Sequence, residues 1–92
     1  MKEELLPQGS VVKIKSSLSK LMIIGYMKLD QNKKVRDYMA VKMPKGYESV
    51  KKLIVFDNED IEKIYYKGYV DESINDYRDD MIWFKKRWNK NE

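Results

Sequence analysis

The sequence predicts an α+β fold, in which a five-stranded, strongly bent antiparallel sheet or small open barrel precedes a C-terminal amphipathic helix. Short segments of alternating apolar and polar residues, separated by turn-forming residues, fill positions 5–69. After position 71 the apolar residues change to a helical spacing. We therefore expect a single domain over residues 1–92, with the sheet core at 5–69 and the helix at 71–88.

The five expected strands are short, and each ends at a turn or a polar segment. In the first strand Val12 and Ile14 share one face, which is typical of a half-buried strand. Gly25 lies inside the second strand and indicates a bulge or a bend. A short helical turn is expected at Asn58–Ile61, between the last two strands. The strands are expected at Val11–Lys15, Leu21–Met27, Val35–Met43, Leu53–Phe56 and Glu62–Lys67.

The C-terminal helix is predicted by apolar side chains that recur at steps of three and four residues: Ile74, Tyr77, Met81, Phe84 and Trp88. Asp71 is expected to cap its N-terminus. With Asp71 as the cap, the helix itself has seventeen residues, which span about 25 Å at the rise of an α-helix. This length is more than a small sheet is expected to cover. The first two turns should therefore cover the core, while the last turns project beyond it.

The projecting turns are the expected partner-binding surface. Tryptophan is enriched where protein interfaces gain most of their binding energy, and apolar rings beside basic residues suit a second protein. The partner is either another protein or a second copy of the chain, which would form a homodimer through the helix. The predicted partner-binding residues are Trp83, Phe84, Trp88, Lys85 and Arg87.

Composition argues against an enzyme. The chain contains neither cysteine nor histidine, which excludes thiol nucleophiles, thiolate zinc sites and the most common general base. The acidic residues between Asp57 and Glu62 are interpreted as helix capping, because the glycine of a calcium loop is missing. We expect no catalytic residue, no metal site and no cofactor. The longest apolar run, Leu21–Ile24, is too short to cross a membrane, and a cytoplasmic location is expected.

The distribution of charge supports one alternative, a basic small barrel that binds nucleic acid. Residues 1–56 carry twelve Lys or Arg against five Asp or Glu, whereas residues 57–92 carry seven against ten. Small barrels bind single strands through lysines and stacking aromatic rings on one sheet face. The residues expected on such a face are Lys13, Lys15, Lys28, Lys42, Tyr26 and Tyr38.

Four segments in this order resemble one known family: Leu5–Val12, Lys20–Tyr26, Phe56–Ile61 and Ile64–Tyr69. It is a small domain-of-unknown-function family of Gram-positive bacteria, often encoded beside LXG polymorphic toxins of the type VII secretion system. The resemblance implies a small cytoplasmic accessory protein that binds a toxin before export, without a catalytic motif. The expected function is therefore a non-catalytic chaperone or adaptor for such a toxin. A toxin-neutralising immunity protein remains a further alternative.

Overall fold

The computed structural model describes residues 5–90, with the side chain of the last of these left out. It has an α+β fold of five strands and one long helix, which confirms the predicted class. Two short 3-10 turns, η1 (Val50–Lys52) and η2 (Asn58–Asp60), flank the fourth strand. The elements are β1 (Val11–Ile14), β2 (Leu21–Leu29), β3 (Val35–Lys42), β4 (Ile54–Phe56), β5 (Ile61–Tyr66) and α1 (Ile74–Lys90).

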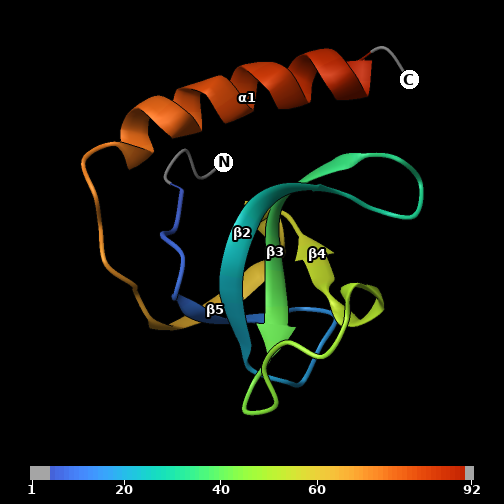
Figure 1. Cartoon of the computed structure of the whole chain (residues 1–92), viewed down its shortest axis with the longest axis vertical. Coiled ribbons are helices and arrows are strands. Elements are labelled where there is room, and N and C mark those ends of the chain that lie inside the picture. The colour runs from blue at the N-terminus through green and yellow to red at the C-terminus, as the bar shows by residue number, and fades with distance from the viewer. Residues whose placement is uncertain (1–4, 91–92) are drawn as a thin grey trace.

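The five strands form one antiparallel sheet in the order β4-β3-β2-β1-β5. The sheet is open, so β4 and β5 are its two edges. Figure 1 shows that β2 is strongly curved and that β1 and β5 run across the direction of β2 and β3. The predicted irregularity at Gly25 is confirmed, because the pairing of β2 with β3 shifts register between Ile23 and Gly25. The strong bend lets one sheet surround much of the core by itself.

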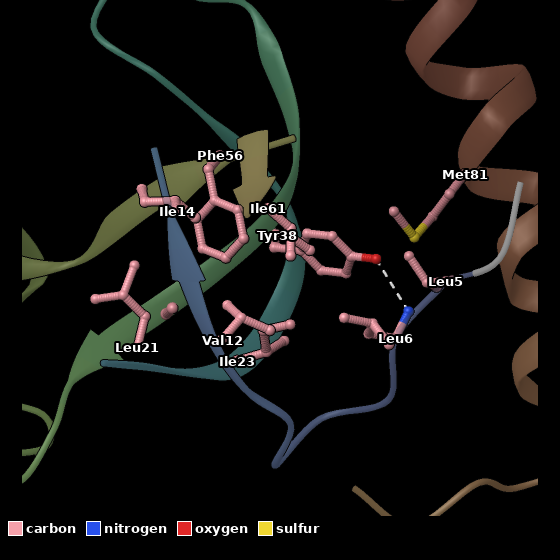
Figure 2. Packing of buried hydrophobic residues seen from close by; sticks show 11 residues of the cluster. Leu5, Leu6, Val12, Ile14, Leu21, Ile23, Tyr38, Phe56, Ile61 and Met81 are labelled. Carbon is pink, nitrogen blue, oxygen red and sulfur yellow. Dashed lines mark hydrogen bonds between the residues drawn. The ribbon is translucent and has the colours of Figure 1, made fainter. Parts of the chain in front are cut away.

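The core is enclosed by the concave side of this sheet. Val12 and Ile14 point into it from β1 as the alternation predicts, and Phe56 enters from β4 (Figure 2). Leu5 and Leu6, which precede the first strand, close the open end of the sheet and belong to the same cluster. The remaining members of the cluster are Leu21, Ile23, Tyr38, Ala40, Ile61 and Met81.

Two tyrosine hydroxyls hold the backbone of Leu6 in place. The N–H of Leu6 donates to the Tyr38 hydroxyl at 2.9 Å, and the Tyr26 hydroxyl donates to the Leu6 carbonyl at 2.7 Å. The Tyr38 hydroxyl in turn donates to the side-chain oxygen of Asn58 in η2. Burial raises the pKa of both phenols, that of Tyr26 to about 12, so both stay protonated and able to donate at neutral pH.

The turn before β1 is tied to β2 and to the end of β5. The Gly9 N–H donates to the Ile23 carbonyl at 2.8 Å, and the Ile23 N–H donates to the Ser10 carbonyl at 2.9 Å. Gly68 donates its N–H to the buried Ser10 hydroxyl at 3.0 Å. A Cβ at Gly68 would lie 2.4 Å from the Gln8 carbonyl oxygen, so only glycine fits this crossing.

Replacing Tyr38 with phenylalanine tests the attachment of Leu6. Tyr38→Phe should lower the free energy of unfolding by about 1–3 kcal/mol, because the buried Leu6 N–H loses its acceptor while the ring volume stays the same. Tyr47→Phe is the matched control at an exposed tyrosine and should change stability by less than about 0.5 kcal/mol. Urea unfolding followed by circular dichroism measures both variants. If the Tyr38→Phe and Tyr47→Phe variants were equally stable, the Tyr38 hydroxyl would not hold Leu6 in place.

Candidate functional site

Helix α1 lies across the end of the sheet that Leu5 and Leu6 close (Figure 1). Only Met81 among its described side chains is fully buried, where it packs beside Leu5 (Figure 2). Ile74 packs against the cluster at the start of the helix. The Asp71 carboxylate accepts the Ser73 N–H at 3.1 Å just before the first turn. Within residues 5–90, the helices fall short of the length and apolar character that crossing a membrane requires.

A network of charges fastens the middle of α1 to the sheet. The Lys85 ammonium donates to Asp37 Oδ1 of β3 at 2.9 Å and to Asp57 Oδ1 at 2.8 Å. The backbone adds two bonds, since the Asp37 N–H donates to Asp57 Oδ1 at 3.0 Å and the Asn58 N–H donates to Asp37 Oδ2 at 2.9 Å. All three charged side chains are at least three-quarters buried. The network therefore links α1, β3 and η2 in a partly desolvated position.

Arg36 extends this network to the loop between β2 and β3. Its Nε donates to Asp30 Oδ2 and a terminal nitrogen donates to Asp57 Oδ2, both at 2.8 Å. Asp30 also accepts the backbone N–H groups of Asn32 and Lys34, which shapes the loop. The guanidinium therefore holds the loop against η2.

The charges shift the pKa values of the groups that they join. Burial opposes ionisation of Asp57, but the hydrogen bonds from Lys85 and Arg36 outweigh it and hold the pKa of Asp57 below its ordinary value of 3.8. Burial also opposes the charge on Lys85, and the two carboxylates nevertheless raise its pKa. Both groups are therefore ionised at neutral pH, and the network is fully charged there.

The last turn of α1 is bound to the hairpin of β2 and β3. The Trp88 indole N–H donates to the Lys33 carbonyl at 2.9 Å. The Asn89 side chain accepts the Val35 N–H at 3.1 Å and donates to the Val35 carbonyl at 3.4 Å. The prediction that the helix end overhangs the sheet is therefore wrong. The hairpin reaches further than expected, because β2 has nine residues and its loop passes under the helix (Figure 1).

Some of the predicted partner-binding residues attach α1 to the sheet, and others lie at the surface. Lys85 is held by Asp37 and Asp57 and is not a free charge at a rim. Trp83 is 62% exposed, and the Arg87 guanidinium lies 5.0 Å from its ring centroid. Phe84 and Trp88 are about 40% exposed and stack at 5.9 Å. We call Trp83, Phe84, Arg87 and Trp88 the ring face of α1.

A groove of about 270 Å³ runs beside α1, on the side of β3 and η2. Met81, Ile82 and Leu5 give it an apolar part, and Lys85 and Asp37 of the charge network also line it. The acidic segment around η2 forms a capped turn. Its Asp60 carboxylate accepts the Asp57 N–H at 2.9 Å, which is the expected capping, and the described residues contain no acidic cluster suited to a metal ion.

The residues of the alternative nucleic-acid face do not gather on one exposed surface. Tyr38 is fully buried and cannot stack on a base, because the bent sheet turns its side of β3 into the core. Tyr26 is half-buried, bonds to Leu6 and packs against the rings of Tyr38 and Tyr77. Lys13 of β1 is paired with Glu62. The other predicted members, Lys15, Lys28 and Lys42, lie just after β1, late in β2 and at the end of β3.

Sequence reasoning missed the exposure of β5. Only its first residue, Ile61, is buried, and large apolar side chains follow along the strand and the segment after it. The alternation in the sequence puts Ile64 and Tyr66 on one face of this strand, but it does not indicate that the strand lies at an edge. Strand order, which short segments of sequence do not encode, decides which strand lies at the edge. The exposed residues are Ile64, Tyr65, Tyr66, Tyr69 and Val70.

Comparison with known protein families assigns the chain to one of them. It belongs to a family described as a domain of unknown function (DUF4176). The profile of that family matches residues 5–76, which include the whole sheet and the first three residues of α1. The ring face of α1 lies beyond the matched span. No curated protein and no solved structure matches the chain.

Removing the Lys85 charge tests the network that holds α1. Lys85→Met should lower the free energy of unfolding by about 2–3 kcal/mol, because two partly buried carboxylates lose their shared cation. Lys86→Met removes the same charge from the neighbouring exposed position and should cost less than about 0.5 kcal/mol. Urea unfolding at neutral pH compares them. If both variants lose equal stability, net charge and not the network is responsible.

The pH dependence of stability tests Asp57 separately. Its pKa is lower in the folded protein, so its contribution is complete above pH 3.8 and is lost as pH falls through the folded value. The stability difference between wild type and Asp57→Asn should therefore be largest near pH 7 and should shrink below pH 4. Urea titrations from pH 7 to pH 3 measure this difference. If the stability difference between wild type and Asp57→Asn stayed constant across that pH range, the lowered pKa of Asp57 would be contradicted.

Proposed function

We propose that this domain is a non-catalytic adaptor or chaperone that binds an LXG toxin of the type VII secretion system in the cytoplasm. The observation that carries the proposal is the ring face of α1. Trp83 stands at the surface beneath a guanidinium, and stacked Phe84 and Trp88 lie beside it. Aromatic rings and arginine are the residue types that contribute most to protein interfaces. A surface of this kind favours a protein partner.

The rigidity of the helix supports this interpretation. The ring face is carried by turns of α1 that are bound to the sheet through Lys85, Trp88 and Asn89. A surface that is already ordered in the free protein loses less conformational entropy when a partner binds. The partner therefore meets a helix that is fixed on the sheet before contact, together with the hydrogen-bonded Trp88 ring.

The identity of the partner rests on the family. The chain belongs to the DUF4176 family, and the resemblance stated above connects such domains with LXG toxins. The absence of histidine and cysteine from the sequence agrees with a protein that binds and does not catalyse. An immunity protein would bind the same toxin but would also block its active site.

Co-expression with the LXG toxin encoded beside the gene tests the proposal. The two chains should elute together in gel filtration. Trp83→Ala should weaken their binding by about 30-fold, which corresponds to the loss of about 2 kcal/mol at an interface hot spot. Tyr47→Ala, which removes an exposed aromatic ring from a different surface, should leave the affinity unchanged. Calorimetry with the purified proteins gives both values.

Three results would contradict the proposal. The first is the absence of an LXG gene from the neighbourhood, and the second is separate elution of the two chains. The third comes from a toxicity assay with the isolated toxic domain. An adaptor should support the solubility or export of the toxin without protecting the cell, so protection would identify an immunity protein instead.

A further inference from the structure

Strand β5 forms an exposed edge of the sheet. It pairs only with β1, and no other strand among residues 5–90 pairs with its outer side. An edge of this kind presents backbone N–H and C=O groups to which another strand can bond. The opposite edge, β4, offers much less, because it has three residues and lies between two 3-10 turns. The edge at β5 is therefore the better place for an added strand.

The side chains of β5 are unusual for an unoccupied surface. Tyr66 is 62% exposed and Tyr69, shortly after the strand, is 84% exposed. Ile64 and Tyr65 are also exposed, so large apolar or aromatic side chains continue along the second half of the strand. Gly68 is bonded to the buried Ser10 hydroxyl, which holds the end of β5 against the turn before β1. The edge is therefore both apolar and fixed in position.

Two lysines lie beside one aromatic ring of this edge, that of Tyr65. The Lys20 ammonium lies 4.8 Å and the Lys63 ammonium 4.9 Å from the centroid of the Tyr65 ring. The pairing with β1 also shifts register twice, which places bulges in this pair of strands. Lysines and bulges on an edge suppress indiscriminate pairing. A second copy of β5 would add its own Lys20 and Lys63 to this positively charged edge, so self-pairing is disfavoured.

We propose that the β5 edge binds an extended, acidic segment of a partner protein by strand addition. Backbone hydrogen bonds to β5 would supply the pairing. Carboxylates on the incoming strand would meet Lys20 and Lys63, and its apolar side chains would cover Ile64 and Tyr66. This surface is separate from the ring face of α1, and the proposal does not depend on the toxin as partner.

Three ten-residue peptides with blocked ends test the proposal against the whole protein. One alternates glutamate and valine, one alternates lysine and valine, and one is the acidic peptide with two central valines replaced by proline. The proline peptide keeps its charge but cannot continue a strand ladder. Fluorescence anisotropy at low salt should give at least tenfold tighter binding for the first peptide than for either of the others. Hydrogen exchange should show protection of β5 amides on binding.

Two double variants locate the site. Lys20→Glu with Lys63→Glu should weaken binding of the acidic peptide at least tenfold. Lys51→Glu with Lys52→Glu makes the same change of net charge beside β4 and should leave the affinity nearly unchanged. The proposal is overturned if the acidic peptide does not bind, if the proline peptide binds equally well, or if β5 amides gain no protection. It is also overturned if a single-stranded oligothymidine binds this face more tightly than the acidic peptide does.

Discussion

The attachment of Leu6 is the interaction on which the rest of the structure depends. The bent sheet encloses a core that is open at one end, and Leu5 and Leu6 close that end. Tyr26 and Tyr38 satisfy both backbone polar groups of Leu6, so this segment can be buried without the cost of unpaired groups. Met81 then has an apolar surface on which to rest, and α1 acquires its position (Figure 2).

The later turns of α1 are attached to the sheet by polar contacts, and this explains the ring face. A helix that uses Lys85 and Asn89 to bind its sheet turns those residues inward. Residues two positions before or after them on the helix point elsewhere, so Trp83 and Arg87 are directed to solvent. The same polar contact that fixes the helix therefore leaves its largest rings available. An apolar contact through Phe84 and Trp88 would have buried them.

Local pattern was enough to predict the elements of the fold. The alternation around Val12 and Ile14, the glycine at position 25 and the spacing of apolar residues after Ile74 each depend on near neighbours in sequence. The charge network could not be predicted in this way, because Lys85 meets Asp37 across 48 positions of the chain. Nor could the burial of Tyr38, which depends on how far the sheet bends and on which segment closes its open end.

The two exposed surfaces differ in their relation to the family. The β5 edge lies within the span that the DUF4176 profile matches, whereas the ring face of α1 lies after it. Figure 1 places α1 at one end of the molecule and β5 toward the other. Two partners, or two segments of one partner, can therefore occupy these surfaces without competing for space. On the proposals made above, the adaptor would use the β5 edge within the span that the family profile matches and the ring face of α1 after it.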